Sequence, residues 1–196
     1  MDIVIIKYNA GNIQSVRYAL ERIGASAVVS DDPATIAAAD KVIFPGVGEA
    51  STAMDYLKER KLDQLIISLK QPVLGICLGM QLMCKYSEEN NTYCMGIFNE
   101  QVKRFEPGPS SLKIPQMGWN NIQALKTPLF NSINENSFCY FVHGYYAEHG
   151  LYTIATTNYG IDYSAALHKN NFYGTQFHPE KSAGIGEQLL RNFIAL

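Results

Sequence analysis

Short apolar runs alternate with amphipathic stretches through the first half of the chain. Buried strands are predicted at residues 2–6, 27–29, 41–44 and 72–76. Helical spacing of apolar side chains marks residues 13–23, 49–60 and 78–86, with Asn12 as the cap of the first helix and Asp32-Pro33 as the start of another. This strand-helix alternation predicts a parallel sheet with helices on both faces.

The sequence pattern changes from about residue 95 onward, where short runs of strand-forming residues are separated by proline, glycine and asparagine. Strands are predicted at 138–142, 152–156, 165–168 and 172–177, with Asn170-Asn171 as a tight turn, and a helix at 186–194. The expected fold is therefore α/β, with a smaller antiparallel β extension in the C-terminal half. A length of 196 residues fits a single domain, 1–196.

Composition narrows the class of protein. Hydrophobic residues make up 47% and charged residues 17%, which excludes a disordered chain, and a net charge of -2 disfavours nucleic acid and anionic membranes as partners. The opening apolar run is too short for a signal-peptide core, so the cytoplasm is the expected compartment. Cys77, Cys84, Cys94 and Cys139 form no CxxC pair, so no metal site or cofactor is expected, and Cys84 and Cys139 should pack as small buried side chains.

The segment Gly75-Ile76-Cys77-Leu78-Gly79 has the spacing of a G-x-S-x-G nucleophile elbow with cysteine in place of serine. It falls at a predicted strand-to-helix junction, where small neighbours permit a sharp turn and the helix N-terminus favours a thiolate. Cys77 is therefore a candidate nucleophile. The alternative is a buried structural cysteine after a tight turn.

A cysteine nucleophile needs a histidine base that is held by another polar group. His178 directly follows the strand predicted at 172–177, and Pro179 stiffens the bend between it and Glu180. His143 also ends an apolar strand but has no acid nearby in sequence, and His149 and His168 lie in polar surroundings. His178 with Glu180 is the predicted pair.

The turn Gly46-Val47-Gly48 ends a parallel strand beside the elbow. It lacks the third glycine and the lysine of persuasive phosphate loops. Its glycines can instead present a backbone N–H group to a developing oxyanion, with the N–H of Leu78 as the second donor. An ordinary strand-to-helix turn is the alternative.

Three segments resemble the class I, triad-type glutamine amidotransferases: PGVG at 45–48, GICLGMQL at 75–82 and TQFHPEKS at 175–182. The resemblance covers the whole chain and implies a flavodoxin-like fold. More narrowly, YNAGN at 8–12, PQMGWN at 115–120 and FVHGYY at 141–146 are similar to the glutaminase subunits of imidazole glycerol phosphate synthases, in histidine biosynthesis.

The resemblance implies hydrolysis of glutamine through a cysteine thioester. Cys77 would be the nucleophile, His178 the general base and acid, and Glu180 its orienting partner. Val47 and Leu78 would donate to the oxyanion, and the substrate would be bound by Gly46, Gly48, Gln81, Gly144 and Tyr145. Lys7 and Gly144 stand where the family more often has aspartate and serine or threonine.

The resemblance also implies a heterodimer with a (β/α)₈-barrel cyclase subunit that consumes the ammonia. Residues in or beside the subfamily-specific segments are the candidate interface: Asn12, Pro115, Met117, Trp119, Tyr140 and Lys181. Trp119 is the strongest anchor candidate, with a core tryptophan as the alternative.

A further hypothesis is that Gly46-Val47-Gly48 presents the Val47 N–H only when the partner carries its ligand. The other open alternatives are a glutaminase feeding a different synthase, a cysteine hydrolase of peptides or γ-glutamyl substrates, and a non-catalytic binding subunit.

Overall fold

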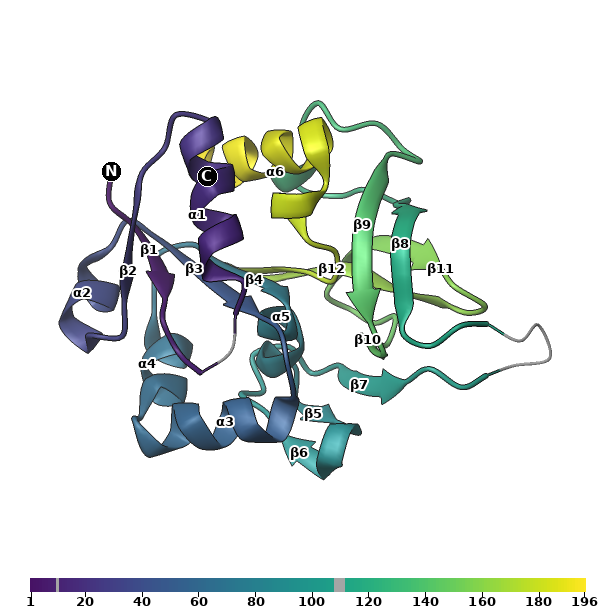
Figure 1. The fold of residues 1–196 in the computed structure, drawn as a ribbon, viewed down its shortest axis with the longest axis horizontal. Coiled ribbons are helices and arrows are strands. Elements are labelled where there is room, and N and C mark those ends of the chain that lie inside the picture. Colours follow the sequence, from purple (N-terminus) through teal and green to yellow (C-terminus); the bar gives the residue numbers. More distant parts are fainter. Residues whose placement is uncertain (10, 108–111) are drawn as a thin grey trace.

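A seven-stranded sheet runs through the middle of the molecule (Figure 1). The computed structural model describes residues 1–9, 11–107 and 112–196, so Ala10 of the 8–12 segment lies outside the described residues. In chain order the strands of this sheet are β1 (Ile3–Ile6), β2 (Ala27–Ser30), β3 (Lys41–Gly46), β4 (Val73–Cys77), β11 (Thr153–Asn158), β12 (Asp162–Lys169) and β13 (Phe172–Thr175). Their order across the sheet is β11-β12-β13-β4-β3-β1-β2. The five strands from β13 to β2 are parallel, while β12 and β11 continue the sheet antiparallel.

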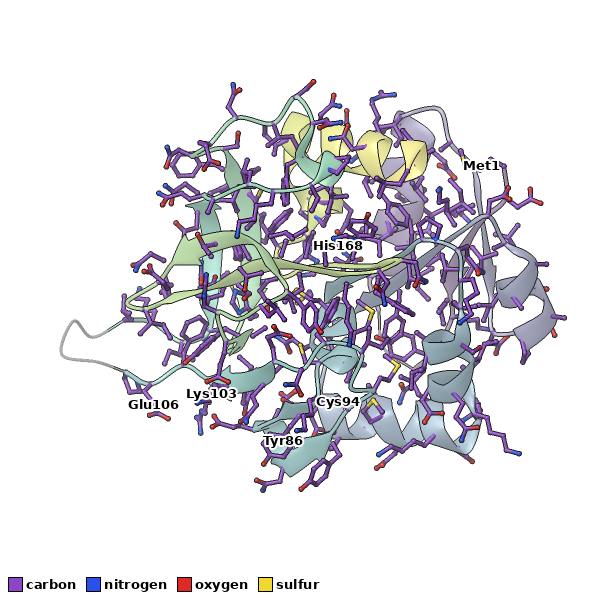
Figure 2. All side chains as sticks on the ribbon, turned by 180° about the vertical axis from the view of Figure 1, so that it is seen from behind. Met1, Tyr86, Cys94, Lys103, Glu106 and His168 are labelled. Atoms are coloured by element: carbon purple, nitrogen blue, oxygen red, sulfur yellow. The ribbon has the colours of Figure 1, made fainter. Side chains whose placement is uncertain are left out.

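Helices cover both faces of the sheet. One face carries α1 (Ile13–Arg22) and α6 (Ala183–Ala195), and the other carries α2 (Pro33–Ala38), α3 (Ala50–Glu59), α4 (Leu62–Ser68) and α5 (Leu78–Met83). The alternation of β1 shows how the two cores separate, because Ile3 and Ile5 pack toward α1 and α6 while Val4 and Ile6 pack toward the other helices. Side chains fill the space on both sides of the sheet (Figure 2).

From residue 86 onward, the chain adds two smaller β units. A four-stranded sheet has the order β10-β7-β5-β6, from β5 (Tyr86–Ser87), β6 (Thr92–Tyr93), β7 (Gln101–Arg104) and β10 (Tyr145–Ala147). An antiparallel pair is formed by β8 (Gln116–Asn121) and β9 (Phe138–His143). Three short 3₁₀ turns complete the described chain: η1 (Glu89–Asn91), η2 (Pro128–Phe130) and η3 (Pro179–Lys181).

The predicted fold class is confirmed, with several differences in detail. The helix predicted at 78–86 ends at Met83, because Cys84 is extended and leads the chain into β5 at Tyr86. Helix α4 was not predicted. Asn12 does precede α1, but its side chain makes no capping bond. The turn at Asn170 is confirmed, with Asn170 at a φ of 56° between β12 and β13. In the described part of the chain, no helix combines the length and apolarity needed to cross a bilayer.

Candidate active site

Cys77 stands at the sharp turn between β4 and α5. Its backbone adopts φ 53° and ψ -111°. Residues other than glycine rarely adopt this conformation, which costs on the order of 1–3 kcal/mol. This conformation ends the strand and begins the helix at one residue, as a nucleophile elbow requires. The Sγ atom lies 3.8 Å from the carbonyl oxygen of Val142. The predicted elbow is therefore present as geometry.

Glycines allow the elbow to pack against the sheet. A Cβ at Gly79 would overlap the carbonyl oxygen of Phe44, and a Cβ at Gly75 would overlap Met83. A Cβ at Gly46, which pairs with Cys77 across β3 and β4, would lie 2.6 Å from the backbone nitrogen of Gly79. These three positions have no room for a side chain, so the elbow depends on close backbone approach rather than on unusual φ angles at the glycines.

His178 and Glu180 form the pair that the sequence predicted. The His178 Nδ1 lies 2.7 Å from the Glu180 Oε1, and both side chains are buried. The same Glu180 oxygen accepts a 3.3 Å hydrogen bond from the Asn12 side-chain amide. Asn12 thus contacts the carboxylate of the pair instead of capping α1.

The charges around His178 favour its protonated form. Burial by itself lowers the pKa of the imidazole, but the negative charges of Cys77 and Glu180 and hydrogen bonding to both outweigh it and raise the pKa to about 10. The Nε2 atom makes no hydrogen bond of regular geometry with any described residue, although the sulfur of Cys77 is close enough to stabilise the charge. Burial and, to a smaller extent, Cys77 also raise the pKa of the nearby Tyr8 hydroxyl.

A cavity of about 280 Å³ opens at the Cys77 turn. It is lined by Val47, Gly48, Cys77, Leu78, Gln81, Glu89, Val142, His143, Gly144 and Tyr145. Both predicted oxyanion donors and four of the five predicted substrate residues line this cavity. Gly46 does not line it, because it is buried at the end of β3. At Gly144 a Cβ would meet only Ile114, at 3.9 Å, so packing does not require glycine there.

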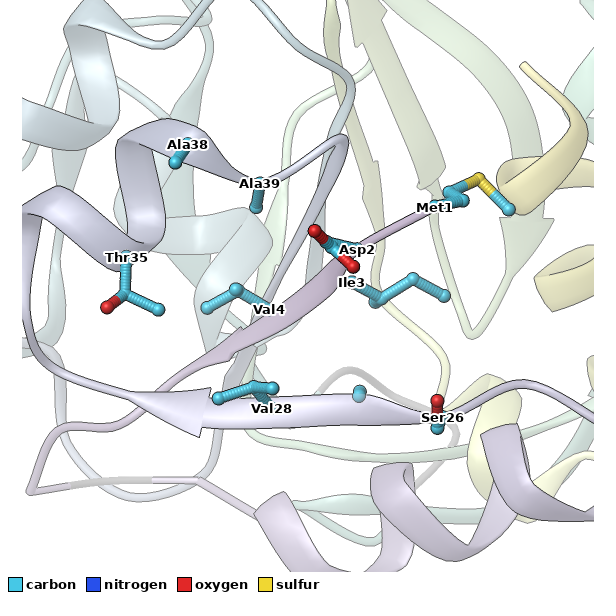
Figure 3. A pocket seen from close by; sticks show the side chains of 10 residues that line it. Met1, Asp2, Ile3, Val4, Ser26, Val28, Thr35, Ala38 and Ala39 are labelled. Atoms are coloured by element: carbon cyan, nitrogen blue, oxygen red, sulfur yellow. The ribbon is translucent and has the colours of Figure 1, made fainter.

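A second cavity, of about 290 Å³, lies at the opposite end of the parallel strands (Figure 3). It is lined by residues at the start of β1, by β2 and by α2, and Asp2 carries its only charged lining side chain in the described chain. Ligands of open α/β sheets bind at the carboxyl ends of the strands, where Cys77 lies. The cavity at Cys77 is therefore the candidate active site.

Four of the six predicted interface residues lie on or beside the outer face of the β8-β9 pair: Met117, Trp119, Tyr140 and Lys181. Trp119 and Tyr140 are cross-strand partners with ring centroids 6.0 Å apart, and the Lys181 ammonium lies 5.9 Å from the Tyr140 ring. Met117 is 66% exposed and Trp119 53% exposed, which rules out a core tryptophan. Pro115 is exposed just before β8, and Asn12 contacts Glu180, the residue before Lys181.

Four residues of the site were not predicted as site residues from the sequence: Glu89, Val142, His143 and Gln176. Glu89 lies in the cavity wall within a polar stretch that is typical of an exposed loop. Gln176 is fully buried, with its amide nitrogen 3.8 Å from the Cys77 Sγ. A signal for Gln176 existed, because a long polar side chain interrupts the apolar run that ends at Phe177. No local signal marked Glu89.

Comparison with known proteins agrees with this geometry. The family profile described as "Glutamine amidotransferase class-I" matches residues 4–196. The chain is 57% identical to the "Imidazole glycerol phosphate synthase subunit HisH" of Bacteroides fragilis and 55% to that of Bacteroides thetaiotaomicron, each over all of both chains. It is 46% identical to that of Haemophilus influenzae, over 99% of this chain and 97% of the relative.

Solved structures share the fold at lower identity. A putative GMP synthase subunit from Thermoplasma acidophilum superposes with a TM-score of 0.77 at 18% identity, covering 100% of this chain and 93% of that one. A structure described as a glutamine amidotransferase gives 0.75 at 17% identity, covering 98% and 97%. The full-length family match and the identities above 50% show that the chain belongs to the class I glutamine amidotransferases, within the family of HisH subunits of imidazole glycerol phosphate synthase.

Proposed function

We propose that this chain is the glutaminase subunit of an imidazole glycerol phosphate synthase, and that it hydrolyses glutamine to glutamate and ammonia at Cys77. The observation that carries the proposal is a strained nucleophile elbow that opens on a cavity, with a buried histidine-carboxylate pair beside its sulfur. Full-length similarity to HisH subunits supports the choice of synthase.

The reaction begins with attack of the Cys77 thiolate on the carbonyl carbon of the substrate side-chain amide. The oxyanion that forms is stabilised by the backbone N–H groups of Val47 and Leu78, which both line the cavity. Collapse of this intermediate breaks the C–N bond, and protonated His178 gives its proton to the leaving nitrogen. Ammonia leaves, and a thioester remains on Cys77.

Hydrolysis of the thioester returns the site to its starting state. His178, now neutral, takes a proton from a water molecule as that water attacks the thioester carbonyl. The sulfur leaves as thiolate, glutamate is released, and His178 is protonated again. Glu180 fixes the imidazole through the 2.7 Å bond to Nδ1, so that Nε2 is the atom that exchanges the proton.

Glu89 is proposed as the group that recognises the α-ammonium group of glutamine. It supplies a carboxylate to a cavity whose other described lining side chains carry no negative charge apart from the thiolate. Its Oε2 accepts a 2.7 Å bond from the Ala50 N–H, which holds the side chain in place. Half-burial raises the pKa of Glu89, so that a cation bound beside it gains from pairing.

The outer face of β8 and β9 is proposed as the surface that docks the cyclase subunit. We define the hairpin face as the residues Met117, Trp119, Phe138, Tyr140 and Lys181, of which the two strands contribute four large side chains on one side. Exposed aromatic side chains beside a cation are typical of interface anchors. Val142, two residues beyond Tyr140 on the same side of β9, lines the cavity, so this face continues into the site. Ammonia could thus pass to a docked partner before it is protonated in bulk water.

The four cysteines are free thiols in the structure, which suits a reducing compartment, and we place the chain in the cytoplasm on this ground.

The proposed function is tested by Cys77→Ala and Cys77→Ser in the complex with the cyclase subunit. Both variants should lose glutamine-dependent turnover by at least about 10³-fold, because no other group can form the thioester. Turnover with added ammonium salts should be retained, since the cyclase reaction does not use Cys77. Cys139→Ser is the matched control and should keep glutamine-dependent turnover. Glutamine turnover by Cys77→Ala at the wild-type rate would contradict the proposal.

A further inference from the structure

A chain of buried polar side chains leads from the inner face of β8 to the sulfur of Cys77. Its members are Gln116, Tyr163, His143, Gln81 and Gln176, each less than 7% exposed. They come from β8, β12, β9, α5 and the segment after β13. Two of them, Gln81 and His143, contact one backbone atom, the carbonyl oxygen of Tyr145, and so join the set into a chain with two arms. Buried polar groups are rarely left unpaired, so the protons of such a chain can be assigned by counting donors and acceptors.

The Tyr145 carbonyl oxygen can only accept, and this fixes the first arm of the network. The Gln81 side-chain nitrogen lies 2.8 Å from it and therefore donates. The same nitrogen lies 2.9 Å from the Gln176 Oε1, which takes the second hydrogen. The Gln176 amide must then point its NH₂ group to the Cys77 Sγ, 3.8 Å away. An N–H donor thus faces the reacting sulfur.

The same carbonyl fixes the second arm. His143 Nδ1 lies 2.7 Å from the Tyr145 oxygen and donates to it, so a neutral His143 has a bare Nε2 that needs a donor. The Tyr163 hydroxyl lies 3.2 Å from this Nε2 and has a single hydrogen to give. Its other neighbour, at 2.7 Å, is the Gln116 Oε1, which is also an acceptor. One hydrogen cannot serve both acceptors, so we assign the Gln116 amide turned by 180°, with its NH₂ group toward the hydroxyl. If the Tyr163 hydroxyl donated to Gln116 instead, His143 would have to donate from both ring nitrogens and would carry a positive charge. Burial lowers the pKa of His143 to about 3, which favours the neutral ring.

We propose that Gln176 stabilises the Cys77 thiolate through its side-chain N–H, and that Gln81, His143 and Tyr163 are positioning residues that hold Gln176 in this orientation. Both lone pairs of the Tyr145 carbonyl are occupied, one by each arm, so the carbonyl is held from two sides. Gln81 keeps only its amide oxygen free, which makes it an acceptor toward the cavity it lines. The inference rests on the proposed function only in naming Cys77 as the nucleophile.

The first test reads the thiolate directly. Cys77 is alkylated with iodoacetamide over a range of pH, and peptide mass spectrometry follows Cys77 apart from the other three cysteines. In Gln176→Met, the midpoint of the alkylation profile should move up by about one pH unit, because the donor to the charged sulfur is lost. Gln188→Met, on α6, is the matched control and should keep the wild-type midpoint. A folded Gln176→Met with the wild-type midpoint would overturn the proposed role of Gln176.

The second test uses the wild-type chain and so does not depend on a variant folding. In ¹⁵N-histidine NMR between pH 5 and 9, His143 should be neutral, with the hydrogen on Nδ1 and Nε2 acting as an acceptor. Tyr163→Phe should shift the Nε2 resonance, while Tyr159→Phe, whose hydroxyl bonds Lys113 instead, should not. A charged His143, or one protonated at Nε2, would overturn the network. Neither test requires glutamine turnover, so a failure here is distinct from a failure of the proposed glutaminase activity.

Discussion

Glu89 is a cavity-lining side chain that comes from outside the recognisable motifs. It reaches the cavity from η1, and its position is set by the 2.7 Å bond from the Ala50 N–H at the start of α3. Glutamine carries an α-ammonium and an α-carboxylate group besides the amide that reacts. A carboxylate in the cavity wall can select the first of these, whereas the triad cannot.

Removal of this charge should therefore affect binding more than chemistry. Glu89→Gln is expected to raise KM for glutamine by about 10- to 100-fold with a smaller change in kcat, because a bond to a charged group contributes about 1.5–3 kcal/mol. Steady-state kinetics of the complex with the cyclase subunit measures both constants. Glu88→Gln, on the neighbouring exposed residue, should leave KM unchanged. An unaltered KM in Glu89→Gln would show that another group binds the ammonium.

At the scale of elements, the β8-β9 pair is the most informative unit because its two sides differ in character. Cys139, Phe141 and His143 are buried on the inner side, while Trp119 and Tyr140 point outward. Strand alternation produces this difference directly, since neighbouring residues face opposite sides. The inner side contributes to the core and to the polar network, and the outer side is free to contact a partner.

Trp119→Ala is expected to weaken the complex with the cyclase subunit by about 2 kcal/mol or more, as for other aromatic anchors. Its side chain is half exposed, so the melting temperature of the isolated chain should stay close to that of the wild type. Titration calorimetry and thermal unfolding measure the two quantities. Tyr93→Ala, 72% exposed on β6, is the control and should keep the wild-type affinity. Equal affinity of Trp119→Ala and wild type would argue against the hairpin face as the docking surface.

The sequence predicted the elements that have a strong local pattern. The parallel strands and the elbow at Cys77 were predicted because short apolar runs end at glycine-flanked turns. The early end of α5 was not, because the apolar side chains after Met83 suit a buried helix as well as the turn toward β5. Glu89 and Gln176 were missed for a different reason: their roles depend on contacts with residues 39 and 99 positions away. Such contacts are products of the tertiary fold and leave no periodic pattern.

For the molecule as a whole, two buried histidines act on stability at opposite ends of the pH scale. Burial lowers the pKa of His143 to about 3, below its ordinary value of 6.5, so the unfolded chain binds a proton there that the folded chain does not. Stability is therefore lost as the pH falls from about 6.5 toward 3. The pKa of His178 is raised to about 10, so its contribution is present below about 6.5 and is lost as the pH rises through 10.

The loss of stability at low pH can be measured by urea unfolding between pH 7 and 4. Near pH 5 the unfolded chain binds about one more proton at His143 than the folded chain does. The wild-type free energy of unfolding should therefore fall by roughly 1.4 kcal/mol for each unit by which the pH is lowered, from this residue alone. In His143→Gln this contribution should be absent, so its acid slope should be shallower by that amount, whatever its stability at pH 7. His149→Gln, on an exposed histidine, should keep the wild-type slope. Identical slopes for His143→Gln and wild type would show that His143 is not excluded from protonation in the folded state.

Tyr140 joins the backbone of His178, the proposed base, to the molecular surface. Its carbonyl oxygen accepts the His178 N–H at 2.9 Å, and its N–H donates to the Ser182 hydroxyl, which in turn donates to the His178 carbonyl. A displacement of this strand would therefore be transmitted to His178 directly through the main chain and also through the short Ser182 side chain. A small molecule wedged against the strand from outside would slow deamidation without competing with glutamine. Inhibitors of that kind would be recognised by a lowered kcat at unchanged KM.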